Sequence, residues 1–362
     1  MPLDRYVTLG RSGLRVSPLC LGTMTFGEEW GWGASIEDSR AILDAYEAAG
    51  GNFLDTANIY TKGHSETIIG DWLHAGDRGR RDRTVIATKF MGNLHRGDPN
   101  SGGAGRKAIV NACEHSLRRL RTDHIDLYWA HFHDRATPIE EMMRTLDDLV
   151  RSGKVRHVGL SDHPAWVCAS AIEVARREGW EAPIALQIEY SLLQRTVEGE
   201  LMPMARHYGL GVTPWSPLRA GILTGKYRRD ARPAPGTTRV PEDSRFLTEA
   251  TYDLIDELVA IADALGTTPA RVALAWVQGR DGVSSTIIGA RTLGQLEDNL
   301  GALEVTLAPE QVAALDAKSV PALPFPCEFL DGVRVAIQHG AVVNGQEADP
   351  WPLGPAGPHE VW

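Results

Sequence analysis

The chain has 362 residues, which is long for one small module but suits one large α/β domain or two ordinary domains. Hydrophobic residues make up 43% and charged residues 23%, close to the globular average, so bulk disorder and a fibrous structure are excluded. The formal net charge of −10 argues against a broad nucleic-acid or anionic-membrane surface, so an anionic ligand has to meet a local cationic site.

The four cysteines lie far apart and have neither CxxC nor zinc-finger spacing: Cys20, Cys113, Cys168 and Cys327. This spacing predicts no structural zinc site and no disulfide framework, and it favours a reducing compartment. The first residues carry no apolar segment of secretory length, and no run in the chain approaches about 18 apolar residues. We therefore expect a soluble, cytoplasmic protein.

The first predicted element is a hairpin with strands at Tyr6–Leu9 and Leu14–Val16. Eight short apolar runs follow, separated by longer helical patterns. These runs are Pro18–Leu21, Phe53–Leu54, Val85–Thr88, Ile125–Ala130, Val155–Leu160, Ile184–Ile188, Gly211–Thr213 and Thr286–Ile288.

Two helices have clear start signals. Ser35 precedes a helix at Ile36–Ala49, and a second helix is predicted from an N-cap, a first-turn proline and a capping-box glutamate at Thr137, Pro138 and Glu140.

Strand-like runs that alternate with helices predict repeated βαβ units, and their nearly continuous apolar character is typical of parallel strands buried on both faces. Eight runs fit a closed (β/α)₈ TIM barrel, which needs about 250 residues. Two Pro- and Gly-rich stretches hold much of the surplus, 228–246 and 321–362, and both are predicted to be lids or mobile loops. We expect one domain over 1–362, with the barrel at about 16–320. A doubly wound sheet is disfavoured because no Gly-x-Gly-x-x-Gly and no Walker A sequence is present.

Polar residues close three consecutive runs: Asp55, Lys89 and His131. In a barrel these ends are neighbours at the face that holds the active site, and Tyr60 follows Asp55 on the next loop. An ammonium beside a phenol stabilises the phenolate and lowers its pKa, and a carboxylate keeps the lysine charged. Tyr60 is then a candidate proton donor to a carbonyl oxygen that His131 orients, while a hydride reaches the carbon. Taken singly, these residues also fit structural roles as a turn cap, a solvated charge and a packed aromatic.

The segment at 53–60, FLDTANIY, closely resembles the signature of the aldo-keto reductase superfamily. Further segments in the family's order cover roughly residues 6–320: 21–27, 63–66, 87–89, 126–131, 159–161, 187–192, 214–218, 223–227, 288–291 and 295–299. The resemblance implies a (β/α)₈ barrel and nicotinamide-dependent carbonyl reduction. It implies Tyr60 as general acid, with Asp55 and Lys89 tuning it and His131 positioning the carbonyl.

The resemblance also implies a set of cofactor contacts: Gly22, Thr23, Met24, Asp55, Ser161, Asp162, Gln187, Trp215, Ser216, Leu218, Gly221, Lys226, Gly289, Arg291, Gln295 and Asn299. In that set, residues 161, 162 and 187 hold the carboxamide, residue 215 stacks on the nicotinamide, and those from 289 onward surround the adenosine. Gly289 and Asn299 also fit structural roles, as a strand end and a helix cap. We expect NADPH (NADP⁺), because Arg291 follows the last strand and Lys226 or Arg219 adds charge for a 2′-phosphate.

The chain departs from the family at Asp162, where asparagine is usual. Our hypothesis is that this carboxylate stabilises the cationic oxidised nicotinamide; facing solvent or capping the next helix are the alternatives. His131 and His133 have metal-ligand spacing, which makes a zinc hydrolase the rival enzyme. We expect no metal. The zinc-hydrolase barrels have a pattern in which the histidine pair lies on the first strand, whereas here the pair closes the fourth run. A third possible function is that of a non-catalytic binding subunit. The presence of all four candidate catalytic residues, Asp55, Tyr60, Lys89 and His131, argues against it.

Aromatic and neighbouring residues are candidates to line a substrate pocket: Trp30, Trp32, Tyr60, Phe90, Met91, Trp129 and His131. They suit aromatic aldehydes, ketones, steroid-like rings or sugar faces, and packing of the loops themselves is the alternative. The segment 323–330 resembles carboxy-terminal loops of bacterial relatives, some acting on sugars or on ketones of secondary metabolites, so a reversible sugar or keto reductase is the second choice. The expected partner is a small carbonyl substrate, without nucleic acid or membrane, and no heptad or repeat predicts an oligomeric state.

Overall fold

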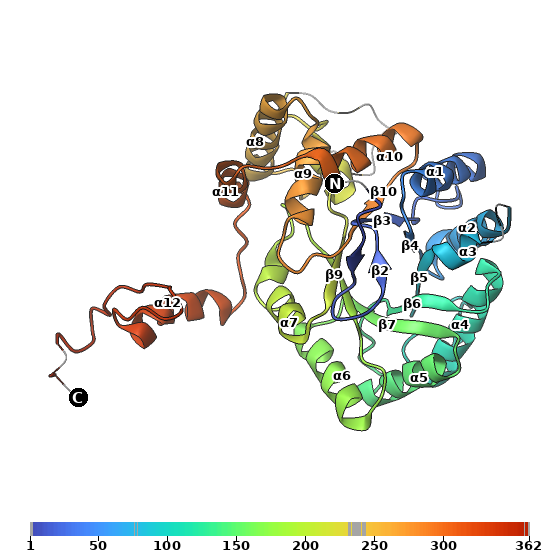
Figure 1. Cartoon of the computed structure of the whole chain (residues 1–362), viewed down its shortest axis with the longest axis horizontal. Coiled ribbons are helices and arrows are strands. Elements are labelled where there is room, and N and C mark those ends of the chain that lie inside the picture. The colour runs from blue at the N-terminus through green and yellow to red at the C-terminus, as the bar shows by residue number, and fades with distance from the viewer. Residues whose placement is uncertain are drawn as a thin grey trace.

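Eight parallel strands form a barrel surrounded by helices (Figure 1), in a computed structural model that describes residues 3–75, 77, 79–230, 233, 240, 244–357 and 359–360. The strands are β3 (Leu19–Gly22), β4 (Phe53–Asp55), β5 (Val85–Phe90), β6 (Ile125–Ala130), β7 (Val155–Ser161), β8 (Ala185–Glu189), β9 (Gly211–Trp215) and β10 (Thr286–Gly289). They pair in the order β10, β3, β4, β5, β6, β7, β8, β9. Each of the eight predicted runs overlaps one of them, and the predicted (β/α)₈ barrel is confirmed.

The barrel closes weakly between β9 and β10, which are the two ends of the paired series. A single parallel bridge, Val212 with Val283, joins the described residues on the two sides. Val212 N donates to Gly282 O at 3.0 Å, and Ser284 N donates to Val212 O at 2.9 Å. Among the described residues, backbone pairing across the seam is therefore confined to the region around Val212.

The N-terminal hairpin, β1 (Val7–Thr8) and β2 (Arg15–Val16), is confirmed and covers the bottom of the barrel. Leu9 and Val16 belong to the same buried cluster as Trp129 in the barrel interior. Gly10 has φ +61° and lies against the backbone of Gly211, where a Cβ atom would clash. Because this end is filled, the opposite, carboxyl-end face of the strands is the one open to a ligand.

Helices and short 3₁₀ turns connect the strands. They are α1 (Ile36–Ala48), η1 (Tyr60–Gly63), α2 (His64–Ala75), α3 (Arg80–Arg83), α4 (Arg106–Leu120), α5 (Ile139–Arg151), α6 (Ala165–Glu178), η2 (Thr196–Glu198), α7 (Leu201–Tyr208), η3 (Arg219–Thr224), α8 (Glu249–Leu265), α9 (Pro269–Gln278), α10 (Leu293–Leu300), η4 (Gly301–Glu304), α11 (Pro309–Lys318) and α12 (Cys327–Gln338). Within the described residues no single helix is long and apolar enough to cross a membrane, although α8 and α9 pass that test together as a pair bent by 98°.

The start of α1 follows the prediction, and the start of α5 does not. Ser35 accepts from the backbone N–H of Asp38 at 3.0 Å, as an N-cap should. The predicted capping box before α5 is wrong, because no side chain caps that helix. The helix begins one residue later than predicted, with Pro138 as its N-cap, and the Thr137 hydroxyl donates to Asp134 at 2.7 Å.

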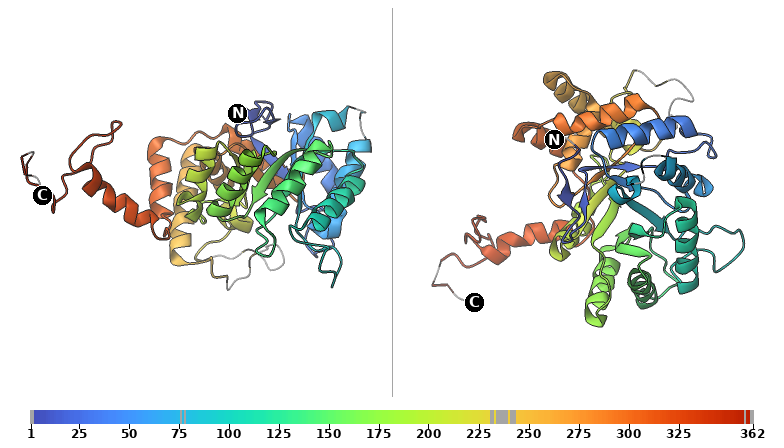
Figure 2. Two further views of the ribbon diagram at one scale, coloured as in Figure 1. Left: turned by 90° about the horizontal axis from the view of Figure 1, so that it is seen from below. Right: turned by 45° about the vertical axis from the view of Figure 1, so that its right-hand side comes forward.

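The two predicted lids have different outcomes. Parts of 228–246, namely 231–232, 234–239 and 241–243, lie outside the described residues, while Arg229 forms ion pairs with Asp253 and Asp256 on α8. The lid prediction for the tail is wrong. After α11 the chain leaves the barrel and α12 stands apart from it (Figures 1 and 2), and no described residue beyond Asn299 lines the cavity at the barrel mouth.

Candidate active site

Lys89 lies at the centre of a buried polar cluster on neighbouring strand ends. Its ammonium donates to a carboxylate oxygen of Asp55, to the carbonyl of Thr56 at 2.8 Å and to the hydroxyl oxygen of Tyr60 at 3.1 Å. An ammonium has three N–H donors, so all of them have partners. Burial alone would lower the pKa of Lys89, but Asp55 and Tyr60 outweigh burial and hold that pKa above its ordinary value. The lysine is therefore charged and fixed in orientation.

Tyr60 stands at the edge of the cavity because the chain turns sharply after it. Thr61 and Lys62 have φ of +46° and +58°, and the Thr61 hydroxyl anchors the turn to the carbonyl of Phe26 at 2.8 Å. Since Lys89 donates into the phenol oxygen, the phenol's own proton is left to point elsewhere. The predicted lowering of the Tyr60 pKa is wrong: burial raises that pKa and exceeds the opposing effect of Lys89. Tyr60 is therefore protonated at neutral pH and able to donate.

His131 follows β6 and lines the cavity, with its ring centroid 6.1 Å from that of Tyr60. Burial, and then the charge of Lys89, lowers the pKa of His131 to about 3. The imidazole is thus neutral at physiological pH. Its Nδ1 atom is buried without a hydrogen-bond partner among the described residues. A neutral ring facing the cavity can donate a hydrogen bond to a ligand oxygen without bringing a charge.

Asp162 and Gln187 extend the cluster along the cavity wall. The side-chain amide of Gln187 donates to Asp55 at 2.9 Å, so both carboxylate oxygens of Asp55 have partners. Asp162 accepts from the indole N–H of Trp215 at 3.0 Å and from the Ser161 hydroxyl at 3.3 Å. Burial raises the pKa of Asp162 to about 6, against the effect of these hydrogen bonds and of Lys89. The helix-capping alternative for Asp162 is wrong, because Pro164 is the N-cap of α6. Its side chain lines the cavity and is exposed to solvent there, so the solvent-facing alternative holds in part.

The cavity has a volume of about 620 Å³ and continues from this cluster toward the ends of β9 and β10. That size is typical of small-molecule and cofactor sites. At the far end Lys226 and Arg291 face the same space, and neither forms an ion pair with another described residue. Burial, and then the charge of Arg291, lowers the pKa of Lys226. Two cations without an acidic partner that face the same space can hold an anion between them.

The backbone beside these cations also leaves room for a ligand. Ser216, Arg219, Ala220 and Gly221 have φ of +52°, +47°, +52° and +91°, and the N–H groups of Arg219 and Gly221 donate within the turn, to the carbonyls of Ser216 and Leu218 at 2.9 and 3.0 Å. A Cβ atom at Gly221 would come within 3.0 Å of the Lys226 ammonium. The cation pair, this turn and the cavity volume together fit a phosphate-bearing dinucleotide.

His131 and His133 do not form a metal site together. Within the described ranges, no group of three or more His, Cys, Asp or Glu side chains is placed to hold a metal ion. His131 faces the cavity, whereas the ring of His133 lies 5.6 Å from that of His163 and 6.1 Å from that of Trp166. The two histidines therefore belong to different environments.

Comparison with known proteins agrees with this geometry. Residues 18–320 match the aldo/keto reductase family. The chain belongs to this family. It is 39% identical over 322 residues to an uncharacterised oxidoreductase, YrpG, of Bacillus subtilis, covering 86% of this chain and 94% of that protein. It is 38% identical over 331 residues to a probable voltage-gated potassium channel subunit beta of Oryza sativa subsp. japonica, covering 86% of this chain and 96% of that one. It is 35% identical over 357 residues to an aryl-alcohol dehydrogenase [NADP(+)] of Phanerodontia chrysosporium, covering 94% of this chain and 91% of that protein.

The cavity of this aldo/keto reductase brings together most of the residues that the sequence singled out. Those that line it are Gly22, Met24, Trp30, Asp55, Tyr60, His131, Asp162, Gln187, Trp215, Ser216, Leu218, Gly221, Lys226, Gly289, Arg291, Gln295 and Asn299. Gly289 and Asn299 also have the structural role considered for them, because the Asn299 amide donates to the Gly289 carbonyl at 3.1 Å.

Thr23 and Ser161, which are predicted to contact the cofactor, do not line the cavity. Both are fully buried. The Thr23 hydroxyl donates to the backbone carbonyl of Asp55 at 3.1 Å and so supports the end of β4. Arg219 does not line the cavity either, because its guanidinium pairs with Glu189. Lys226 and Arg291 are therefore the cations of the predicted set that remain at the cavity.

Three of the predicted pocket aromatics do not line the cavity. Phe90 follows Lys89 in β5 and so points to the opposite face of the sheet, where its ring lies 5.0 Å from that of Tyr128. Trp129 is buried in the barrel interior beneath the site. Trp32 packs on Trp30 with ring centroids 5.7 Å apart, and Trp30 alone of that pair faces the cavity.

Sequence reasoning missed part of the lining: Thr25, Ile59, Phe132, Pro217, Ala220, Thr224, Ala270, Leu274, Ile287, Ile288, Ala290 and Asp298. Phe132 had a usable signal, because it follows the His131 strand end directly. Ala270 and Leu274 lie four residues apart on α9, and an apolar pair at that spacing predicts an ordinary buried helix face just as well.

Proposed function

We propose that this chain is an NADPH-dependent oxidoreductase that reduces an aldehyde or ketone to an alcohol with Tyr60 as the general acid. The observation that carries the proposal is the hydrogen bond from Lys89 into the Tyr60 oxygen at 3.1 Å, at the edge of the cavity. It leaves the phenol proton free for a substrate oxygen and places a fixed positive charge beside the phenolate that results.

Each wall of the cavity suits one part of the dinucleotide. Asp162, Gln187 and Trp215 would hold the nicotinamide end, next to Tyr60. Ser216, Leu218 and Gly221 would lie along the pyrophosphate, and Gly289, Gln295 and Asn299 around the adenosine. Lys226 and Arg291 would hold the 2′-phosphate, which is the reason for preferring NADPH over NADH.

When bound, the reduced nicotinamide supplies a hydride to the carbonyl carbon. The side chains of this chain act on the oxygen. Neutral His131 donates a hydrogen bond that orients the carbonyl, and Tyr60 transfers its proton as negative charge develops on the oxygen. Because burial raises the pKa of Tyr60, the transfer depends on that developing charge and on the Lys89 ammonium. Bulk water then restores the phenol proton.

An aryl aldehyde or aryl ketone is the proposed substrate class. Trp30 and Phe132 line the cavity beside the catalytic pair, and the ring of Trp30 lies 6.3 Å from that of Tyr60 in an edge-on arrangement. Flat aromatic walls favour a flat aromatic ligand. The relative named aryl-alcohol dehydrogenase [NADP(+)] supports the same class. A reversible sugar or secondary-metabolite keto reductase is the second candidate, because the same stacking walls accept a sugar face.

Tyr60→Phe tests the proposal, because it removes the proton donor and keeps the ring. NADPH oxidation is measured with a panel of aryl, aliphatic and sugar aldehydes, and NADP⁺ reduction with the matching alcohols. We expect kcat to fall by about 10²- to 10⁴-fold while the Kd for NADPH, measured by fluorescence, changes little. An unchanged rate would contradict Tyr60 as the acid. NADPH binding without turnover of any carbonyl in the wild type would instead favour a non-catalytic binding subunit.

A further inference from the structure

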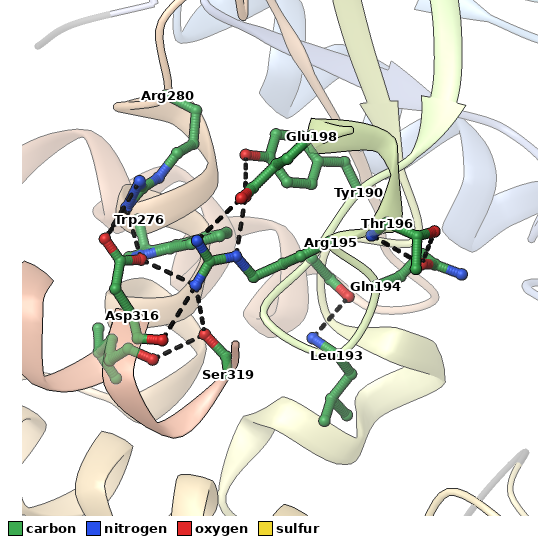
Figure 3. A network of polar contacts seen from close by, with 12 residues as sticks. Tyr190, Leu193, Gln194, Arg195, Thr196, Glu198, Trp276, Arg280, Asp316 and Ser319 are labelled. Carbon is green, nitrogen blue, oxygen red and sulfur yellow. Dashed lines mark hydrogen bonds and ion pairs between the residues drawn. The ribbon is translucent and has the colours of Figure 1, made fainter. Parts of the chain in front are cut away.

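The C-terminal arm, defined here as residues 320–360, is firmly anchored where it leaves the barrel (Figure 3). Arg195, only 9% exposed, donates to the Asp316 carbonyl at 3.2 Å and to the Ser319 hydroxyl at 2.8 Å. It also makes two bonds to Glu198, at 2.8 and 2.9 Å. Arg280 holds the Asp316 carboxylate at 2.9 Å. The end of α11, from which the arm departs, is therefore fixed on the barrel.

Beyond this anchor the arm turns away from its own barrel. Gly199 lies against Leu323 and Cys327 at the start of the arm. From there α12 stands clear of the barrel (Figures 1 and 2). The segment after α12 folds back on it, because His339 accepts from the backbone N–H of Trp351 at 2.9 Å. The arm thus has a defined shape of its own.

The arm has no core. None of the arm side chains that the structure describes is buried, and Leu315 is the last residue of the main hydrophobic core. A unit of about 40 residues needs a disulfide, a metal or another chain to be stable. The four cysteines are all free, and no metal cluster occurs among the described residues. Another chain is the remaining source of stability.

The exposed face of α12 carries an apolar stripe, which we define as Phe325, Phe329, Leu330, Val333 and Ile337. At 3.6 residues per turn, the last four fall within a sector of about 100° on the helix. Phe329, Leu330 and Ile337 are 59%, 56% and 76% exposed, and the ring of Phe325 extends the stripe at 5.9 Å from Phe329. A stripe of this kind is normally the buried face of a helix.

The apolar surface of the arm is large enough for a stable protein interface. Eight of the fourteen exposed large hydrophobic side chains among the described residues lie in the arm. Together these eight expose on the order of 900 Å², a little more than half of it from the stripe. A stable interface buries about 800 Å² on each partner, so it has to include the arm surface around Val320, Val342, Val343 and Leu353 as well as the stripe. The arm carries five acidic residues and one basic residue, so an anionic lipid surface is a poor match.

We propose that the arm stripe packs against the same stripe of a second copy of the chain, about a two-fold axis, and that the protein is a dimer joined by its arms. Every copy presents the same unpaired stripe, so a two-fold axis brings two matching apolar faces together and leaves none exposed. Two helices that meet in this way pack side-chain ridges into grooves. This inference is independent of the proposed reaction.

The test is the molar mass of the full-length protein in solution, measured by light scattering and sedimentation at about 20 µM with reductant to keep Cys327 reduced. We expect two chains for the wild type and one chain for the double variant Phe329→Asp, Ile337→Asp. The cavity lies at the barrel mouth and neither residue lines it, so cofactor binding and circular dichroism should not change. Leu265→Asp is the matched control, because Leu265 is 40% exposed and lies outside the arm, and it should remain a dimer.

Two results would overturn the proposal. One is a wild-type mass of a single chain, and the other is a double variant whose mass equals that of the wild type. Flotation with phosphatidylcholine vesicles identifies the alternative occupant: a single-chain wild type that floats, and a double variant that does not, would assign the stripe to a lipid surface.

Discussion

Trp215 donates its indole N–H to Asp162 at 3.0 Å, so the ring proposed to stack on the nicotinamide is held by the carboxylate that stands where the family usually has asparagine. An asparagine could offer its carbonyl oxygen to the same indole, but only the aspartate adds a charge that titrates. If the ring stacks on the nicotinamide as proposed, the charge of the cofactor ring and the protonation of Asp162 would affect each other.

Asp162 should therefore distinguish the two redox states of the cofactor in a pH-dependent way. Its pKa is raised to about 6, so it is mostly neutral below that pH and mostly ionised above it. The oxidised nicotinamide is cationic and the reduced one is neutral. We expect the ratio of the Kd for NADP⁺ to the Kd for NADPH to fall by about five- to tenfold from about pH 5 to about pH 7.5.

Calorimetry on the wild type and on Asp162→Asn checks this prediction. The ratio removes the titration of the cofactor's phosphate, whose pKa near 6 affects both redox states alike. His131 does not interfere, because its pKa is about 3. In Asp162→Asn we expect a ratio that stays constant with pH. A variant that retains the wild-type slope would show that another group is responsible.

Lys89→Met should separate the catalytic role of the ammonium from its structural role. The substitution leaves Asp55 buried with an unpaired charge, which costs roughly 3–5 kcal/mol in the free energy of unfolding. Adding Asp55→Asn removes that charge and should restore most of the stability. The rate should stay low in both variants, because the phenolate of Tyr60 has lost its counter-charge. Denaturant unfolding and steady-state kinetics on both variants measure the two effects, and a double variant with wild-type kcat would refute the role of Lys89.

Lys226→Met and Arg291→Met should weaken the preference for NADPH. We expect each to lower kcat/KM for NADPH by about tenfold or more and to leave kcat/KM for NADH nearly unchanged, because NADH lacks the 2′-phosphate. Arg219→Met is the control, since Arg219 pairs with Glu189 and does not line the cavity. A wild-type enzyme that prefers NADH by tenfold would contradict the assignment of the cation pair.

Trp30→Ala should weaken the binding of aryl substrates without affecting the cofactor. Loss of one stacking wall is expected to raise KM for an aryl aldehyde by about tenfold, with a smaller effect on an aliphatic aldehyde of similar size. Trp32→Ala is the matched control, because Trp32 packs on Trp30 but does not line the cavity. Equal effects of the two substitutions would mean that the loop is needed only for its own packing.

The fold was predictable because each strand is an apolar run buried on both faces, so its sequence differs plainly from that of the amphipathic helices. The candidate catalytic residues were predictable for a related reason: Asp55, Lys89 and His131 each stand at a strand end, and parallel strand ends meet. Single polar residues in a regular pattern therefore located the site before any distance was known.

Effects that depend on neighbours from elsewhere in the chain were not predictable in this way. The sequence places a lysine near Tyr60, but it does not give the degree of burial that makes the pKa rise. The start of α5 was predicted one residue too early, because the sequence does not show that Pro138 and not Thr137 is its N-cap. The anchoring of the end of α11 on the barrel depends on Arg195, which lies more than one hundred residues before Asp316 and Ser319. Phe90 is different, because strand alternation after Lys89 would have shown that it faces outward.

The weak seam of the barrel would make the lifetime of this protein depend on the proposed cofactor. Trp215 and Ser216 line the cavity on the β9 side of the seam, and Ile288 and Gly289 line it on the β10 side. A dinucleotide that contacts both sides would bridge two strand ends that the backbone joins at a single point. Amide hydrogens of β10 should then exchange with solvent far more slowly in the complex, while those of β5 change little. Cofactor supply would in this way govern how long the chain survives proteolysis.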